Sequence, residues 1–199
     1  MAKKQLKNIF LSASIPLKER DAEYYDTADV IAIRDAVLAL TTEVLPRYRL
    51  IWGGHPSITP LIAHVMERLG FNSQEHVTLY QSKFFEKFFP KDNELFAKII
   101  LTENMGDRDS SLLKMRERMF EENEFVAGVF IGGMEGIEDE LKLFREYHPG
   151  AIILPVASTG AAALKVYKEL SIELAGDHDR LKNDYAYTSV FQDLLIDKI

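Results

Sequence analysis

The sequence predicts a doubly wound, mostly parallel α/β sheet with helices on both faces. Two observations carry this prediction. Short apolar runs without polar alternation recur along the chain, as is typical of parallel strands that are buried on both faces. Between them lie segments with a helical apolar period, and this alternation favours βαβ units. With 199 residues, the chain is expected to form one domain over residues 1–199.

Four apolar runs predict strands in the first half of the chain, over residues 9–15, 50–52, 77–81 and 98–102. Pro16 stops the first strand, and a charged surface loop is expected over residues 17–27. Apolar periodicity predicts two helices, over residues 30–45 and 58–69. Asp29 and Ser57 precede these helices as expected N-caps, and Gly70 is the expected C-terminal glycine of the second.

The second half of the chain continues the alternation. Strands are expected over residues 125–131 and 151–156, and helices over residues 110–122, after the Gly132–Gly133 turn, and over residues 161–170 and 187–196. Residues 83–97 are expected to be irregular or partly helical. Their phenylalanines, at positions 84, 85, 88 and 89, indicate packing or a subunit interface, and so favour a homodimer. Trp52, within a strand, is expected in the core.

Composition excludes several classes of function. The 24 basic and 31 acidic residues give a net charge of −7, which argues against binding nucleic acid or an anionic membrane. Without cysteine there are no disulfides or thiolate metal sites. The five histidines form no cluster with metal-ligand spacing, so we expect no catalytic metal and no other cofactor. No apolar run approaches the ~20 residues of a membrane span, and no signal segment follows Met1, so a cytoplasmic protein is expected.

Small residues follow four of the expected strands, where the carboxyl ends of a parallel sheet line the ligand crevice. Any one such turn is typical of a tight connection, but four together favour a site for phosphate and ribose. The candidate ligand-binding residues of these turns are Ser12, Ser14, Gly53, Gly54, His55, Gly132, Gly133, Ser158, Thr159 and Gly160. His55 is either a hydrogen-bond donor or acid in the site, or a capping or packing residue. No G-x-G-x-x-G or P-loop motif is present, which excludes ordinary dehydrogenases and P-loop enzymes.

Two motifs make a family resemblance specific. Met115-Arg116-Glu117-Arg118-Met119 and, after the strand, Gly132-Gly133-Met134-Glu135-Gly136-Ile137-Glu138-Asp139 resemble the paired motifs of LOG-like (lonely-guy, lysine-decarboxylase-like) proteins of the SLOG superfamily. Those motifs are Met-x-x-Arg-Lys and Pro-Gly-Gly-x-Gly-Thr-x-Glu-Glu. The resemblance implies a Rossmann-like fold and a homodimer. The chain departs from the family at Met119, Ile131 and Glu135-Gly136, which replace a lysine, a proline and Gly-Thr.

The resemblance implies two functions. SLOG sensor modules read nucleotide or NAD-derived signals in bacterial defence, which predicts that the Gly-Gly turns hold phosphate. Glu135, where the chain departs from the motif, is expected to hold a hydroxyl of the ligand, and Gly136 is a further candidate ligand-binding residue. Phosphoribohydrolases of the superfamily release bases from nucleotides. For an N-glycosidase or ribosyl transferase, the aligned catalytic residues are Arg118 and Glu138. From the residues alone, a structural role is as well supported as a catalytic one: Glu138 would complement a helix dipole, and Arg118 would lie on a solvated helix face. A purely structural domain predicts no small-molecule binding.

Overall fold

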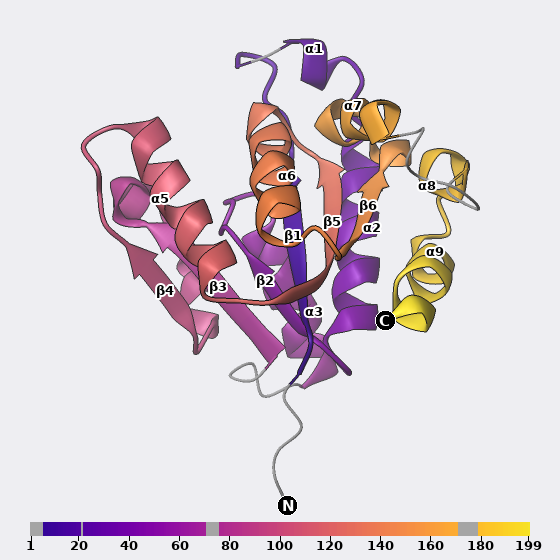
Figure 1. The fold of residues 1–199 in the computed structure, drawn as a ribbon, viewed down its shortest axis with the longest axis horizontal. Helices are drawn as coiled ribbons and strands as arrows, with labels where there is room; N and C mark the ends of the chain where they lie inside the picture. Colours follow the sequence, from indigo (N-terminus) through magenta and orange to yellow (C-terminus); the bar gives the residue numbers. More distant parts are fainter. Residues whose placement is uncertain (1–5, 21, 71–75, 171–178) are drawn as a thin grey trace, which may run out of the picture.

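The computed structural model describes residues 6–20, 22–70, 76–170 and 179–199. Six strands form one open sheet in the order β4-β3-β2-β1-β5-β6, and every neighbouring pair is parallel. The strands are β1 Asn8–Ser14, β2 Arg49–Trp52, β3 Val77–Ser82, β4 Ile99–Thr102, β5 Phe125–Gly132 and β6 Ile152–Val156. Figure 1 shows this sheet between two layers of helices, which confirms the predicted α/β class.

Alternating side chains of each strand build two cores, one on each face of the sheet. Ile9 and Leu11 of β1 pack with α2 Val30–Val44, α3 Thr59–Leu69 and α9 Tyr187–Leu194. Phe10 points the other way and packs with three further helices, α5 Arg108–Glu121, α6 Glu135–Tyr147 and α7 Ala161–Leu170. Because both faces are covered, the strands carry the continuous apolar runs that the sequence shows.

Helix boundaries agree with the sequence where a cap forms and differ where a side chain finds another partner. Asp29 caps α2 by accepting a hydrogen bond from the Ala32 amide at 2.9 Å, and Gly70 ends α3 with a φ of 62°. Ser57 does not cap α3, which begins at Thr59. The Ser57 hydroxyl instead accepts from the Ile15 amide at 3.2 Å.

Short helical turns complete the described chain: α1 Ala22–Tyr25, α8 Asp179–Asn183, and the 3-10 turns η1 Lys83–Phe88, η2 Lys91–Leu95, η3 Ala157–Thr159 and η4 Ile196–Lys198. The turn α1 lies within the stretch that the sequence predicted as a loop. Tyr24 explains it, because its ring is buried and its hydroxyl donates to Glu138. A loop with such an inward anchor is not a free surface loop.

The strand order places a topological switch point at β1. The chain moves outward from β1 through β2, β3 and β4, then returns to the other side of β1 with β5. In open α/β sheets the crevice at the carboxyl ends of the strands around such a point receives ligands.

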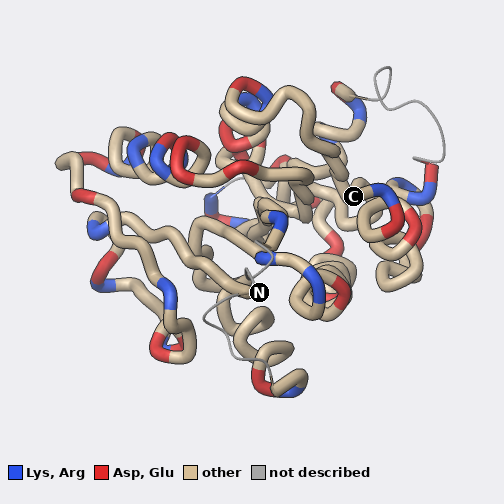
Figure 2. Tube along the Cα trace, turned by 60° about the horizontal axis from the view of Figure 1, so that its bottom comes forward, with Lys and Arg blue, Asp and Glu red and all other residues tan. Residues whose placement is uncertain are grey.

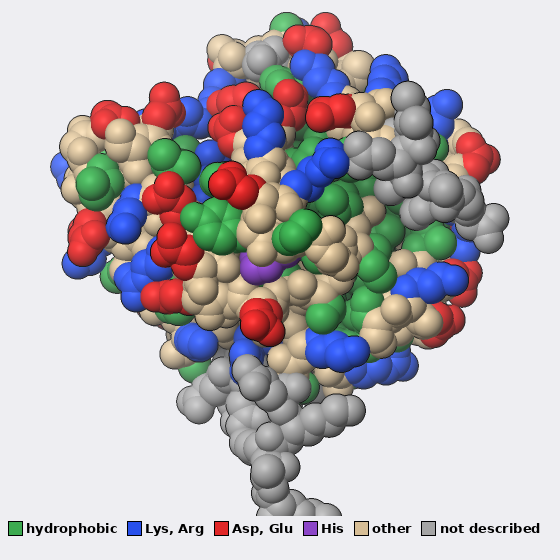
Figure 3. Space-filling model, in the orientation of Figure 1, with side chains coloured by type: hydrophobic (Ala, Val, Ile, Leu, Met, Phe, Trp, Pro, Cys, Tyr) green, Lys and Arg blue, Asp and Glu red, His purple; other side chains and the backbone are tan. Residues whose placement is uncertain are grey.

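Acidic and basic residues alternate along the helices around the sheet (Figure 2), and both signs intermix on the face covered by α5, α6 and α7 (Figure 3). Within the described ranges, no helix has the length and apolar character that crossing a bilayer requires.

Candidate functional site

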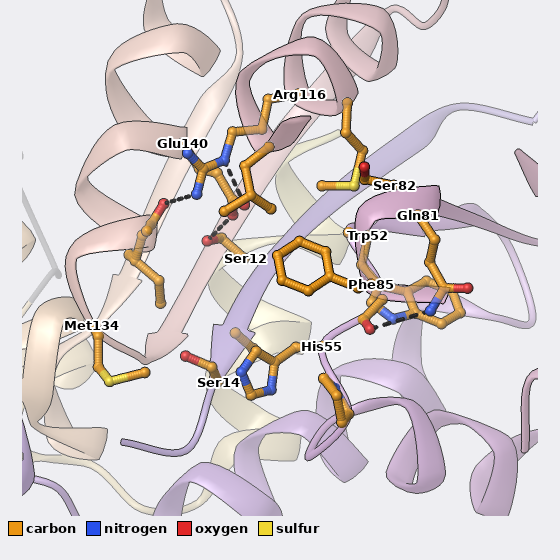
Figure 4. Close-up of a pocket in the computed structure, with 18 of the residues that line it drawn as sticks. Ser12, Ser14, Trp52, His55, Gln81, Ser82, Phe85, Arg116, Met134 and Glu140 are labelled. Carbon is orange, nitrogen blue, oxygen red and sulfur yellow. Dashed lines mark hydrogen bonds and ion pairs between the residues drawn. The ribbon is translucent and has the colours of Figure 1, made fainter. Parts of the chain in front are cut away.

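A cavity of about 280 Å³ opens at the carboxyl ends of β1, β2 and β3, beside the start of α6. Its volume is near the lower end for ligand pockets in proteins. Seven of the candidate residues from the sequence line it: Ser12, Ser14, Gly53, Gly54, His55, Glu135 and Gly136. Figure 4 shows Ser12, Arg116 and Glu140 on one side of this cavity, and Trp52, Phe85 and Gln81 on the other.

A buried ion pair forms the polar side of the cavity. The Arg116 guanidinium donates to Glu140 Oε1 at 3.2 Å, and also to Asp139 and to the Gly136 carbonyl. The Arg116 and Glu140 side chains are only 8% and 15% exposed. The other Glu140 oxygen accepts from the Ser12 hydroxyl at 2.5 Å. Since buried charges must be paired, this network holds a carboxylate and a hydroxyl in fixed positions at the cavity wall.

A second charged group lies at the more exposed part of the cavity. Arg20 and Arg108 both donate to Oε1 of Glu135, at 2.5 and 3.1 Å. The three side chains belong to three separate segments: the connection after β1, the start of α5 and the start of α6. All three line the cavity. The cavity therefore contains three guanidinium groups although the whole chain is acidic.

His55 is a neutral imidazole at pH 7. Burial, and to a smaller extent the nearby Arg20 charge, lower the pKa of this side chain from 6.5 to about 4. Its Nδ1 lies 2.8 Å from the Ser57 hydroxyl, and the Ser57 amide donates to it at 3.3 Å. In the free protein, neutral His55 can exchange hydrogen bonds with a ligand, but it is not the imidazolium that acts as a general acid at neutral pH.

Aromatic side chains form the apolar side of the cavity. Phe85, Phe88 and Phe89 line it from η1 and the residue that follows, and Phe88 is 73% exposed. Trp52 is buried as expected and packs edge-on against Phe96, with 5.1 Å between ring centroids. The sequence interpretation assigned the phenylalanines to packing or to a subunit interface. The signal for a site was their position directly after β3, at the carboxyl edge of the sheet.

Comparison with known proteins adds the family. Residues 23–195 match the model of the SLOG cluster3 family. The chain belongs to this family. This confirms the SLOG resemblance and indicates a nucleotide-related function. No curated protein matches the chain. An X-ray structure of the structural-genomics target TM1055 is similar in fold, with a TM-score of 0.57 and 15% identity over 88% of this chain and 89% of that one.

The glycine pair of this SLOG protein does not line the cavity. The Gly132 amide donates to the Thr159 hydroxyl at 2.9 Å, and the Gly133 amide donates to the Ser14 carbonyl at 2.8 Å. Because both N–H groups already have protein acceptors, they are not free for a phosphate in this conformation. These two hydrogen bonds connect the end of β5 to η3 and to the end of β1, whose Ser14 lines the cavity.

The last predicted turn of the SLOG domain also lies outside the cavity lining. The Ser158 hydroxyl is 3.1 Å from that of Tyr187, and Thr159 bonds the Gly132 amide. A Cβ at Gly160 would lie 1.8 Å from the Thr27 carbonyl oxygen. These residues bring η3 and α7 close to neighbouring segments, and their polar groups serve that packing.

The two aligned catalytic residues, Arg118 and Glu138, do not meet at the cavity. Arg118 pairs with Glu122 at 2.8 Å and donates to the Leu101 carbonyl on the outer side of α5. Glu138 accepts from Tyr24 at 2.5 Å. Helix residues two positions apart point about 200° apart. Arg118 and Glu138 therefore face away from the cavity when Arg116 and Glu140, each two positions along the same helix, face it. The structure instead brings together Arg116 and Glu140, two positions from each of them.

The SLOG cavity offers oxygen and nitrogen groups but no metal cluster. Among the residues that the structure describes, no three histidine, aspartate or glutamate side chains gather in a way that could hold a metal ion. The polar groups that line the cavity are guanidinium groups, carboxylates, hydroxyls, an amide and a neutral imidazole.

Proposed function

We propose that this SLOG protein binds a nucleotide or an NAD-derived small molecule in the cavity, as a recognition module in nucleotide signalling. One observation carries the proposal: three guanidinium groups and several aromatic rings line the same cavity, with Arg116 across it from Phe85 and Trp52 (Figure 4). Arginine forks match phosphate oxygens, and aromatic faces match a nucleobase. A role in bacterial defence and a homodimer, both implied by the family resemblance, remain proposals.

The three chemical parts of a nucleotide have separate partners in this arrangement. Phe85 and Phe88 offer rings for the base, and Ser12 with Glu140 offers hydrogen-bonding oxygens for the ribose. A ribose hydroxyl donating to Glu140 gives a charge-assisted hydrogen bond in a partly buried site. A ligand with base, sugar and phosphate therefore uses the whole cavity, whereas a free base or a free phosphate uses only part of it.

A thermal-unfolding screen tests this proposal. Nucleoside monophosphates, NAD, ADP-ribose and cyclic nucleotides are added to the wild type, and a ligand at about 100 times its Kd is expected to add ~2.7 kcal/mol of stability. Phe88→Ala removes an exposed ring from the cavity and is expected to weaken binding by about fivefold, since base stacking on a ring contributes ~1 kcal/mol.

Tyr185→Ala is the matched control, because Tyr185 is an exposed aromatic residue outside the cavity lining. It is expected to bind like the wild type. If no nucleotide raises the unfolding temperature, or if both variants lose affinity equally, the recognition function at this cavity is rejected.

A second candidate function is cleavage of an N-glycosidic bond. It is favoured by the Glu140 carboxylate, which Arg116 and Ser12 fix at the cavity wall. A carboxylate in this position can stabilise an oxocarbenium-like transition state or orient water. Release of free base from nucleoside monophosphates, abolished in Glu140→Gln and retained in Glu138→Gln, would establish it. Binding without any release of base would leave recognition as the function.

A further inference from the structure

Two arginines from distant segments converge on one carboxylate oxygen at the exposed side of the cavity. Nη2 of Arg20 lies 2.5 Å and Nη2 of Arg108 lies 3.1 Å from the same Oε1 of Glu135. Both guanidinium groups and the carboxylate line the cavity. The arrangement therefore presents two cationic forks to a single anionic atom at the place where a ligand would enter.

Stability alone does not explain why three long side chains share this arrangement. The Arg20, Arg108 and Glu135 side chains are 40%, 41% and 44% exposed. Ion pairs with this exposure contribute little to folding, because solvent screens them and the side chains lose rotamer freedom. For the same reason the Glu135 carboxylate can be displaced at little cost.

The charge of the group favours an anion larger than a carboxylate. Within the cavity lining, two guanidinium groups face one carboxylate. Arg108 also donates to Asp109 at 2.9 Å, but the Asp109 side chain is 86% exposed and lies outside the lining, so solvent screens its charge. Converging guanidinium forks are the arrangement that binds phosphate through several charge-assisted hydrogen bonds. A phosphoryl group has three terminal oxygens and up to two negative charges, so it satisfies both forks better than one carboxylate oxygen does.

We propose that Arg20 and Arg108 are the phosphate subsite of the cavity, and that Glu135 occupies this subsite in the free protein. The inference rests on the proposed nucleotide-binding function and assigns its phosphate end. A nucleotide phosphate displaces the Glu135 side chain and accepts hydrogen bonds from both arginines. Glu135 thereby selects for phosphorylated ligands, because a nucleoside carries no anion that can replace it. The two arginines take the phosphate-binding role that the sequence predicted for the Gly132–Gly133 turn, because the amides of that turn already donate to protein acceptors.

Calorimetric titration with inorganic pyrophosphate tests the subsite without a nucleoside. Glu135→Gln removes the competing charge and keeps the side-chain shape, so it is expected to bind pyrophosphate at least about tenfold more tightly than the wild type, or ~1.4 kcal/mol. Adding Arg20→Gln to Glu135→Gln is expected to abolish this gain. Glu146→Gln, an exposed residue near the other end of α6, is the matched charge control and is expected to change nothing.

The outcomes separate this inference from the proposed function. Unchanged or weaker pyrophosphate binding in Glu135→Gln, or a gain that survives Arg20→Gln, overturns the subsite. If a nucleotide binds the wild type in that case, the recognition function still stands. If the pyrophosphate gain appears and no nucleotide binds any variant, the subsite stands and the nucleotide function fails.

Discussion

At the scale of single residues, His55 shows how burial sets the chemistry of the cavity. The folded protein keeps this imidazole neutral, with a pKa of about 4. In the unfolded chain the ordinary pKa is ~6.5, so the unfolded state takes up a proton first as the pH falls. The contribution of His55 is therefore fully present above pH ~6.5 and is lost as the pH falls towards 4.

We expect the wild type to lose about 2 kcal/mol of unfolding free energy between pH 7 and pH 5 through His55 alone. His55→Asn keeps a hydrogen-bonding side chain that does not titrate, so its loss over this range is expected to be smaller by that amount. Urea denaturation at the two pH values measures both. His64→Asn removes an exposed imidazole and serves as control. An equal pH dependence in the wild type and in His55→Asn would show that the folded protein protonates His55 over the same pH range as the unfolded chain.

At the scale of elements, one helix face decides which arginine belongs to the site. Met115, Arg116 and Met119 lie on the buried side of α5, whereas Arg118 lies on the outer side. Arg116→Met leaves the Glu140 carboxylate buried without its cation, which costs roughly 3 kcal/mol. Arg118→Met breaks an exposed pair with Glu122 and is expected to cost less than ~1 kcal/mol.

Chemical denaturation of these two variants measures the difference, and the shared helix and identical substitution make them a matched pair. Equal losses of stability would contradict the inward position of Arg116. A smaller loss in Arg116→Met than in Arg118→Met would reverse the assignment of the two faces.

The same helix shows what the sequence could and could not predict. The boundaries of most elements followed from apolar periodicity and from caps such as Asp29. The motif alignment selected Arg118, although the apolar stripe that Phe120 forms with Met115 and Met119 places Arg116 on its side of the helix. The partners of the Gly133 amide could not be predicted, because the Ser14 carbonyl comes from another strand and no local pattern records that contact.

At the scale of the whole molecule, the two-sided burial of the sheet made the fold predictable. Parallel strands covered on both faces need apolar side chains on both, and that leaves uninterrupted apolar runs in the sequence. The order of the strands leaves no such pattern, because it depends on where each βα unit packs. The cavity depends on that order, since β1, β2 and β3 must be neighbours for Ser12, His55 and Gln81 to meet.

Phe10 joins the central strand to the helices that carry the cavity, and its removal is expected to affect the whole molecule. Its ring contacts four others, with centroid distances of 5.0, 5.4, 5.8 and 5.9 Å to Phe120, Phe144, Phe125 and Phe130. These rings belong to α5, α6 and β5. Phe10→Ala leaves a buried void among them and is expected to cost about 3–5 kcal/mol. The exposed Phe88→Ala is expected to change stability by less than ~0.5 kcal/mol.

Urea unfolding of both variants provides the measurement. A lower midpoint with an unchanged m-value in Phe10→Ala would show that the sheet and its helices still unfold as one unit, only less stably. A reduced m-value would mean that α5 and α6 separate from the sheet before the rest unfolds. Because Arg116 and Glu140 lie on these two helices, such a separation would also dismantle the polar side of the cavity. Stability in this core and the geometry of the site are therefore expected to be lost together.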